Sequence, residues 1–586
     1  MRFACGIPVA LVFTAGVSAA QSSPREAAVD SFVTAQMTRR AIPGLSLAII
    51  DGGRIVYSKG YGVAEVGSAT PVTTSTLFQA GSISKSVAAF GALRLVEQGK
   101  LSLDTDVNAT LKSWKLPASS LAASKPVTLR GLLSHSAGLT VHGFPGYAMG
   151  GPLPTLVQVL DGAQPANTPP IRVDLEPGST WRYSGGGYTV MQQMMLDVTG
   201  QTFPDYMRSV VIEPVGMSAS SFEQPLPTTL AAKTATGHSN QRLAVPGRWH
   251  VYPEMAAAGL WTTPTDLARF AIEVQQAYAG KSSRVISPGM ARQMLTDQKN
   301  SDGLGVFLHG SGRTLLFEHG GRDEGFDASM NALAESGQGA VVMINTNDNS
   351  PMVGRIVEFI ARQYAWPTAT KAASPVPEEV QRSADQLRPY VGRYELSNNN
   401  MISFDLVGKR LFSISDRFPD EEFIAVGDGR FASADNDSRL TFSRNATGAV
   451  TGITWTRDGK DRSIPRIGPP FTKLARSVDP DTAFTRKLEG TLRTLAKGGL
   501  EVAGAPQLTA GAQRDFSRAG PWPTVVGLRS ISFVAEERVA GRGLERHDNA
   551  VDRIRYYAVT TDGGVRSLLV WMTKDGLITD FDQVSD

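Results

Sequence analysis

The chain has 586 residues, of which 41% are hydrophobic and 19% charged, and its formal net charge is +3. This length exceeds the size of a single hydrophobic core, so the composition predicts an ordinary soluble globular protein with about two to four domains. The small net charge, without any block of Lys and Arg, argues against nucleic acid as a partner.

Residues 1–20 are typical of a secretory signal peptide. Arg2 supplies the positive charge, an apolar stretch runs from Ile7 to Val17, and small residues precede a cleavage site at Gln21. The apolar stretch is too short to span a membrane, so we expect no stable membrane insertion, with an uncleaved anchor as the alternative. Cleavage would remove Cys5, the only cysteine, and with it any disulfide, thiolate-bound metal or cysteine nucleophile. We expect a bacterial protein that is periplasmic or secreted.

Residues 28–365 show the pattern of a mixed α/β domain. Apolar segments at 45–50 and 54–57 flank Asp51-Gly52-Gly53, which is a strand–turn–strand signal. Further elements are expected in chain order, with helices over 187–198 and 264–278 and strands over 314–317 and 340–345. Because strands occur early and late around a helical middle, we expect one sheet assembled from both ends of the domain.

Two smaller domains are expected after a linker over residues 366–380, which is rich in proline and poor in large apolar residues. Short alternating segments predict a small, lipocalin-like β-barrel over 381–466, and a second break is expected at 465–470. Residues 480–586 predict a small α+β domain without a catalytic constellation. The expected elements of these domains are strands over 390–396, 401–406, 410–414, 430–432, 439–442, 450–456, 554–560, 567–572 and 577–581, and a helix over 482–497.

A serine and a lysine three residues apart, Ser82 and Lys85, are the strongest catalytic signal. On a helix this spacing puts both side chains on one face, and the apolar run Val87–Val96 indicates that the helix is buried. A serine hydroxyl needs a nearby base, and a lysine taken out of water can lose its proton and serve as one. The helix N-terminus also offers a backbone N–H for an oxyanion. The pattern alone is common, and a solvated helix face is the alternative.

Two later segments carry further candidates. Tyr183 stands beside a glycine cluster that marks a tight turn, and its hydroxyl, next to a lysine, is a candidate general base held near its ionised form. His319-Gly320-Gly321-Arg322 follows the strand expected at 314–317, where glycines let a substrate or another backbone approach closely. His319 is also a candidate base for a serine, although no acid partner is evident. The alternative to a functional role is a simple turn with a buried aromatic for the Tyr183 segment, and a strand-to-turn transition for the His319 segment.

In their order and wide spacing, these elements resemble the serine β-lactamase and penicillin-binding-protein superfamily. The resemblance covers about residues 28–365 and is strongest to its class C-like branch, which includes family VIII esterases and D-aminopeptidases. The superfamily pattern is Ser-x-x-Lys, then Tyr-x-Asn, then Lys/His-x-Gly. Here it reads as Ser82-Ile83-Ser84-Lys85, Tyr183-Ser184-Gly185 and His319-Gly320-Gly321.

The resemblance implies an antiparallel sheet flanked by helices, with a helical subdomain. It implies Ser82 as the acylated nucleophile, Lys85 as its proton partner and Tyr183 as the base and later proton donor. The backbone N–H groups of Ser82 and Arg322 would form the oxyanion hole, with His319, Gly321 and position 185 contacting substrate. No cofactor is implied. Resemblance to D-aminopeptidases further implies that the C-terminal domains shape or cover the site.

Two departures bear on the substrate. Gly185 replaces the superfamily's Asn, which holds the substrate amide and the lysine, and a neutral His319 in place of Lys weakens binding of a β-lactam carboxylate. We therefore expect an exported serine hydrolase that cleaves a small-molecule ester, amide or peptide. The alternatives are a non-hydrolytic or weakly active penicillin-binding-like protein that captures peptidoglycan-type ligands, and a β-lactamase. The sequence leaves the oligomeric state open.

Two other site types are disfavoured. Ser134-His135-Ser136-Ala137-Gly138 resembles the nucleophile elbow of α/β-hydrolases, but its first glycine and the preceding strand are missing. Neither a His-x-x-x-His pattern nor a carboxylate cluster suggests a metal site.

Overall fold

A computed structural model of the protein describes residues 23–584 except 240–241, 348–349, 369–378, 398–399, 408–409, 415–420, 434–437, 458, 470–476, 498–505, 518–521, 523–524, 540–544, 547–548 and 562–563. The expected signal peptide, Cys5 and most of the expected linker therefore lie outside the described residues. The chain divides into two compact units, Met1–Ala369 and Thr370–Asp586, and each is described by itself. Among the described helices, none is long and apolar enough to cross a membrane.

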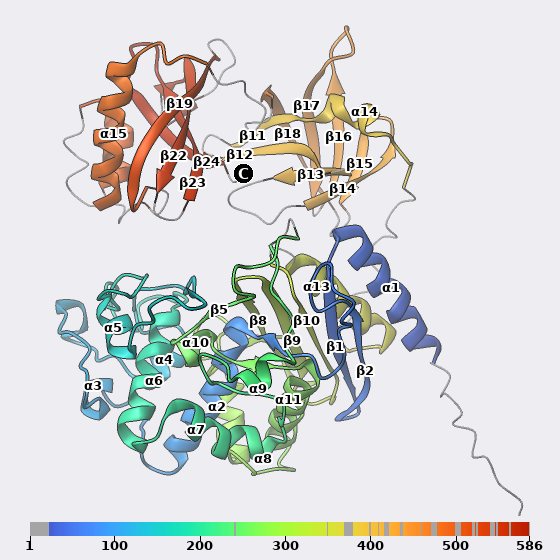
Figure 1. Ribbon diagram of the computed structural model, residues 1–586, viewed down its shortest axis with the longest axis vertical. Coiled ribbons are helices and arrows are strands. Elements are labelled where there is room, and N and C mark those ends of the chain that lie inside the picture. The colour runs from blue at the N-terminus through green and yellow to red at the C-terminus, as the bar shows by residue number, and fades with distance from the viewer. Residues whose placement is uncertain are drawn as a thin grey trace, which may run out of the picture. The chain divides into compact units, whose positions relative to one another are not determined.

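The first unit is built on one six-stranded antiparallel sheet (Figure 1) in the order β2-β1-β10-β9-β8-β7. Its strands are β1 (Gly44–Asp51), β2 (Arg54–Gly62), β7 (Phe307–His309), β8 (Leu316–Asp323), β9 (Phe326–Leu333) and β10 (Gly339–Ile344). β1 pairs with β10, with Leu45 opposite Ile344. This pairing confirms the expectation that early and late strands join in one sheet.

The two faces of this sheet pack against different helices. Leu47 on β1 belongs to a cluster with α1 (Pro24–Arg40) and α13 (Ser350–Gln363), whereas its neighbour Ala48 belongs to the main core on the other face. Successive residues of a strand point to opposite faces, so an unbroken apolar strand can serve two layers at once. The chain therefore forms a helix–sheet–helix arrangement.

The main core also contains the helical part of the unit. Its central helix is α2 (Ser84–Glu97), which follows a single 3-10 turn at Gly81–Ile83 and is buried nearly all round, as expected. The other elements of this part are α3 (Val107–Thr110), α4 (Leu129–Leu133), α5 (Leu156–Asp161), α6 (Gly185–Thr199), α7 (Phe203–Met207), α8 (Glu213–Val215), α9 (Thr228–Ala231), α10 (Met255–Ala258), α11 (Pro264–Tyr278), α12 (Pro288–Met294), and the short strands β3 (Phe78–Gln79), β4 (Tyr147–Ala148), β5 (His250–Val251) and β6 (Trp261–Thr262).

The strand expected over 314–317 is placed wrongly by the sequence pattern. Residues Gly312–Thr314 form a 3-10 turn, and β8 continues through the glycines to Asp323. The chain turns only at Glu324-Gly325, where Gly325 has φ +84° and Asp323 pairs with Phe326. The true hairpin signal is thus a Glu-Gly pair, and the two earlier glycines lie inside the strand.

The second unit contains a closed barrel of eight strands, as the sequence predicts. Its strands are β11 (Gly392–Ser397), β12 (Asn400–Val407), β13 (Arg410–Ile414), β14 (Glu421–Gly427), β15 (Arg430–Ser433), β16 (Arg439–Arg444), β17 (Val450–Arg457) and β18 (Lys460–Gly468), after the short helix α14 (Ala384–Leu387). The domain break predicted at 465–470 is wrong for residues 465–468, which belong to β18. Pro465 pairs with Gly452 of β17, and β18 closes the barrel by pairing with β11. β14 and β18 have no counterpart among the expected strands.

The rest of the second unit is a four-stranded antiparallel sheet with helices. The strands lie in the order β19-β22-β23-β24, and apolar residues of α15 share a core with this sheet. The bounds are α15 (Thr482–Lys497), α16 (Ala510–Ser517), β19 (Leu528–Arg538), β20 (Glu545–Arg546), β21 (Asn549–Ala550), β22 (Arg553–Thr561), β23 (Gly564–Met572) and β24 (Ile578–Val584). That the C-terminal domains shape the site stays a prediction.

In the first unit, two glycines bring β8 against the chain just before Ser82. Gly81 has φ +52°, and a Cβ there would lie 2.3 Å from the Arg322 nitrogen. A Cβ on Gly321 would lie 1.9 Å from the Ala80 carbonyl oxygen. Both contacts are with backbone, which cannot move aside without shifting the strand or the helix start. Glycine is therefore required at both positions to hold β8 beside Ser82.

Gly321→Ala is expected to destabilise the first unit by about 1–3 kcal/mol, because the added methyl group forces β8 away from Ala80. Gly320→Ala is the matched control, since a Cβ on Gly320 would meet only the Ala328 oxygen at 3.9 Å. Urea unfolding followed by circular dichroism measures both variants. Equal stability of the two would contradict the close approach.

Candidate active site

Ser82 and Lys85 meet at the start of the buried helix. Ser82 lies in the 3-10 turn and Lys85 in the first turn of α2, so the chain places them one turn apart. Lys85 Nζ lies 2.9 Å from Ser82 Oγ and donates to the Ala257 carbonyl oxygen at 2.8 Å. The geometry expected from the three-residue spacing is therefore present.

Lys85 is almost completely buried, with 2% of its surface exposed. Burial lowers its pKa to about 7, although the negative charge of Asp323 acts in the opposite direction. Near neutral pH a large share of Lys85 is therefore an uncharged amine. Such an amine can donate to Ala257 and still present its lone pair to the Ser82 hydroxyl proton.

Tyr183 belongs to the same cluster but does not have the expected protonation state. Lys85 Nζ lies 5.0 Å from the centre of its ring. Burial raises the pKa of Tyr183 well above its usual range, and the contact with the Ser82 hydroxyl only partly offsets this. The expectation that Tyr183 is held near its ionised form is thus not met, and its hydroxyl can pass a proton rather than start as the base.

His135 is a site residue that sequence reasoning missed. Its ring lies 4.1 Å from the Tyr183 ring, and its Nδ1 accepts the backbone N–H of Ser184 at 3.1 Å. Burial lowers its pKa well below the usual value, so the ring is neutral and positions Tyr183 through packing. The signal was the segment Ser134–Gly138, which the sequence offered only as a poor nucleophile elbow. Ser134 is fully buried and donates to the Arg130 carbonyl oxygen, as a structural serine does.

A side chain at position 185, such as the asparagine that the resemblance leads one to expect, would make tight contacts with its neighbours. A Cβ there would lie 3.0 Å from Phe144 Cε2 and 3.1 Å from the His142 carbonyl oxygen. The Gly185 N–H donates to that same oxygen at 2.9 Å. The segment 142–144 thus occupies the space beside Gly185, and its His142 and Phe144 line the pocket.

His319 lies behind the pocket rather than on its wall. It is 4% exposed, its ring lies 6.2 Å from that of Tyr183, and its Nδ1 donates to the Gly320 carbonyl oxygen at 2.6 Å. Burial and the nearby Lys85 lower its pKa to about 3. His319 is therefore neutral at physiological pH and cannot offer the positive charge of a lysine. Neither His319 nor Gly321 is among the residues that line the cavity.

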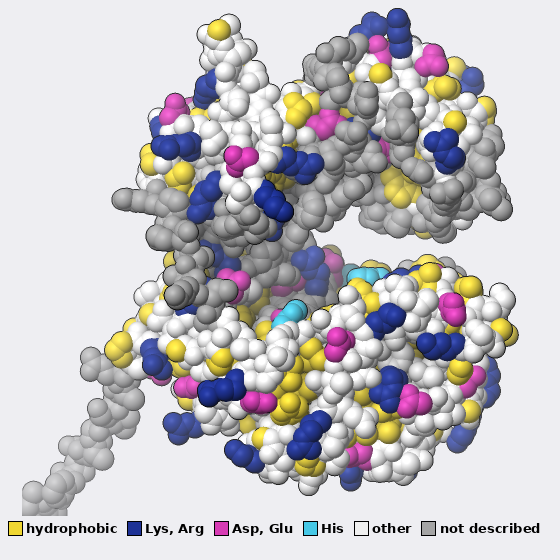
Figure 2. Space-filling view, turned by 180° about the vertical axis from the view of Figure 1, so that it is seen from behind, with side chains coloured by type: hydrophobic (Ala, Val, Ile, Leu, Met, Phe, Trp, Pro, Cys, Tyr) yellow, Lys and Arg dark blue, Asp and Glu magenta, His cyan; other side chains and the backbone are white. Residues whose placement is uncertain are grey.

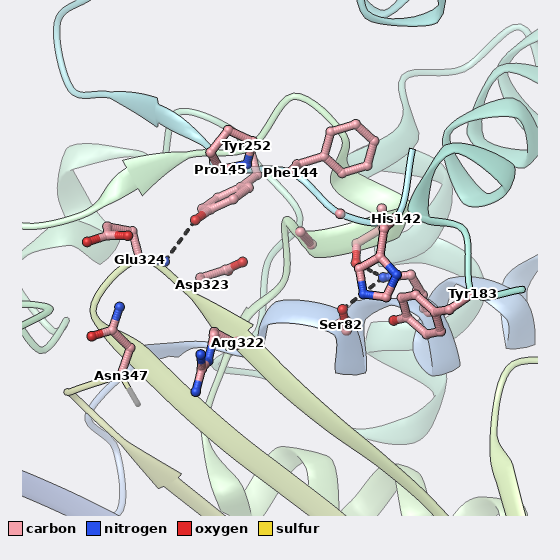
Figure 3. A pocket seen from close by; sticks show the side chains of 14 residues that line it. Ser82, His142, Phe144, Pro145, Tyr183, Tyr252, Arg322, Asp323, Glu324 and Asn347 are labelled. Atoms are coloured by element: carbon pink, nitrogen blue, oxygen red, sulfur yellow. Dashed lines mark hydrogen bonds between the residues drawn. The ribbon is translucent and has the colours of Figure 1, made fainter. Parts of the chain in front are cut away.

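The pocket in front of Ser82 is a cavity of about 340 Å³ (Figure 3). Its walls are Ser82, Lys85, Tyr183, the segment 142–145, Tyr252, Ala257, Ala258, the β8 end 322–324 and Asn347. The Tyr252 hydroxyl accepts the backbone N–H of Glu324 at 2.9 Å and so fixes the hairpin at this wall. Among the residues that the structure describes, no cluster of His, Cys, Asp or Glu could hold a metal ion.

Carboxyl groups lie on one wall of this pocket. Asp323 and Glu324 line the pocket, and Glu254, which is completely buried, interacts electrostatically with Asp323. Burial raises the pKa of Glu254 to about 7. Arg322 also lines the pocket, but its guanidinium pairs with Asp327 at 3.0 Å. The chemistry that this arrangement suits is acyl transfer to Ser82 beside an acidic wall.

The chain is similar to several known proteins. Relatives include penicillin-binding protein 4 of Amycolatopsis lactamdurans (27% identical, 44% of this chain and 66% of the relative) and a teichoic acid D-alanine hydrolase of Staphylococcus aureus (26%, 42% and 57%). The chain thus matches less than two thirds of the length of these relatives. Solved structures of similar fold include an octameric penicillin-binding protein homologue of Pyrococcus abyssi (TM-score 0.48, 20% identical, 75% of this chain and 99% of that one) and the D-amino acid amidase of Ochrobactrum anthropi SV3 (0.48, 22%, 58% and 98%).

The sequence model of the family described as Beta-lactamase matches residues 29–364, which are more than half of the chain. This range holds the antiparallel sheet, the buried helix with Ser82 and Lys85, and the pocket in front of them. The mixture of helices and sheet in the first unit is the β-lactamase/transpeptidase-like fold, as the resemblance implied. The chain therefore belongs to the Beta-lactamase family, within the superfamily of serine β-lactamases and penicillin-binding proteins.

Proposed function

We propose that this protein is an exported serine hydrolase that forms an acyl-enzyme at Ser82 and cleaves a small ester, amide or peptide. The contact that carries the proposal is the one between Ser82 Oγ and Lys85 Nζ, because burial makes Lys85 a base near neutral pH. The name of one relative, a teichoic acid D-alanine hydrolase, supports hydrolysis of such a bond. Export rests on the signal-like residues 1–20.

The proposed reaction begins when Ser82 Oγ attacks the substrate carbonyl and its proton moves to Lys85 Nζ. The backbone N–H groups of Ser82 and Arg322 would stabilise the resulting oxyanion, since the two glycine contacts hold β8 beside the helix start. Tyr183, which keeps its own proton, would pass a proton from Lys85 to the leaving group. Water then takes the place of the leaving group and releases Ser82.

The pocket disfavours a β-lactam as substrate. A β-lactam carries a carboxylate, and the wall opposite Tyr183 presents Asp323 and Glu324. His319, which is neutral, cannot compensate that charge, and Arg322 pairs with Asp327. The exposed carboxylate of Glu324 therefore favours neutral or cationic esters and amides over anionic substrates.

Ser82→Ala is expected to remove both the hydrolysis of p-nitrophenyl esters and labelling by a fluorophosphonate probe, with a loss on the order of 10³-fold or more in kcat. Ser134→Ala is the control, because Ser134 is buried and hydrogen-bonded to Arg130. It should keep the labelling. Labelling of Ser82 without turnover would favour a ligand-capturing protein, and turnover in Ser82→Ala would sink the assignment.

The pH profile of kcat/KM should rise through about pH 7 and then level off, because Lys85 must lose its proton to act as a base. Burial also raises the pKa of Glu254 and Asp302 to about 7, so the experiment must show which of these groups causes the inflection in the pH profile. An amine has a much larger enthalpy of ionisation than a carboxyl group. The inflection should therefore shift strongly with temperature and persist in Asp302→Asn, whereas a temperature-independent inflection would rule out Lys85.

Lys85→Met should abolish activity and raise the melting temperature at pH 7. The folded state lowers the pKa of Lys85, so the unfolded chain binds an extra proton between about pH 7 and 10.5 and folding is penalised there. This penalty is complete below pH 7 and vanishes as the pH approaches 10.5. Calorimetry should accordingly show that the melting temperature of Lys85→Met exceeds that of the wild type by a margin that shrinks from pH 7 to pH 10. A margin that does not depend on pH would contradict the buried amine.

A further inference from the structure

Asp323 is a buried carboxylate that the proposed reaction does not use. It ends β8, lines the pocket and is 3% exposed. Neither of its oxygens makes a hydrogen bond of normal geometry with a described residue, although the Gly81 N–H is near enough to favour the ionised form. Buried carboxyl groups are normally paired or hydrogen-bonded, so this one has capacity left for a partner.

The charged groups around Asp323 do not include a cation that forms an ion pair with its carboxyl group in the described residues. Lys85 is near, but its amine contacts Ser82 and Ala257 and has a pKa of about 7. Glu254 and Glu324, which are also near, add negative charge. Burial and these carboxyl groups raise the pKa of Asp323 well above its usual value. A positive charge brought into the pocket would meet Asp323 and Glu324, which both line it.

Asp323 also lies close to the place where the substrate reacts. It follows Arg322, whose backbone nitrogen would meet a Cβ on Gly81, the residue before Ser82. Figure 3 shows its carboxyl group between Glu324 and Ser82, below the Tyr252 ring. A group bound to Asp323 would thus belong to the part of the substrate nearest the scissile carbonyl.

We propose that Asp323 binds a primary ammonium group on the acyl part of the substrate, so that the substrate class is esters or amides of amino acids with a free amine. Glu324 strengthens the attraction from the open side of the pocket. Where Asp323 carries a proton before binding, that proton leaves to solvent as the ammonium group arrives. This inference rests on the proposed function, because it names the substrate of the same site.

The test compares two substrates of the same shape. Alanine p-nitroanilide, in D and L forms, carries an ammonium group where isobutyric acid p-nitroanilide carries a methyl group. We expect kcat/KM to be at least about 10-fold higher for one alanine anilide than for the isobutyric anilide, as a buried ion pair allows. Asp323→Asn should reduce this ratio to near one. A general structural defect would cancel in the ratio.

Glu318→Gln is the matched control, because it removes one negative charge from the same strand where Glu318 contacts His309 and not the pocket. It should keep the ratio. Equal kcat/KM for the amine and its isostere in the wild-type protein would overturn the amine site. So would a ratio that survives in Asp323→Asn.

A binding measurement separates this inference from the hydrolase proposal. Thermal shift of the full-length protein is recorded with each anilide, for the wild type and for Asp323→Asn. Stabilisation by an alanine anilide that the variant loses supports the amine site, even where no anilide is cleaved and the hydrolase proposal alone fails. Equal shifts by the amine and its isostere overturn the amine site.

Discussion

The burial of one amine, that of Lys85, constrains most of the first unit. An ammonium group loses its hydration in the core, and this loss lowers the pKa of Lys85 to about 7. The Ala257 carbonyl oxygen accepts a hydrogen bond from the buried amine. The same loss of hydration that costs stability creates a base beside Ser82. The burial of Lys85 thus lowers the stability of the fold and raises the reactivity of the site, a trade-off that is common at active sites.

The rest of the site depends on how closely a strand can approach that helix. Gly81 and Gly321 allow β8 to pass within backbone contact of the residues before Ser82. This approach brings the Arg322 N–H and the Asp323 carboxyl group to the wall of the pocket. The sheet therefore contributes both the expected oxyanion donor and the acidic character of the site, although it carries neither Ser82 nor Lys85.

The position occupied by Gly185 shows how a family pattern can change without leaving a gap. The segment 142–144 fills the space beside Gly185, and His142 and Phe144 form part of the pocket wall. The contacts that an asparagine at position 185 would make are absent, and the pocket wall there is formed by His142 and Phe144 instead. Similarly, the His135 ring supports Tyr183 by packing against it at a tilt. His135, His142 and Phe144 were not candidates from the sequence motifs, because all three act through contacts between segments far apart in the chain.

What the sequence alone determined was local. The three-residue spacing of Ser82 and Lys85, the apolar helix after them, the apolar strands of the sheet and the alternating segments of the barrel can be read from period and composition. Where it erred, as at the glycines of β8 and at Pro465, a turn-forming residue was used inside a strand for close contact or for barrel closure. The tertiary structure alone decided the protonation of Lys85 and Tyr183, the filling of the space at Gly185 and the burial of Asp323 at the pocket wall. These depend on burial and on neighbours distant in sequence, and no local pattern carries that information.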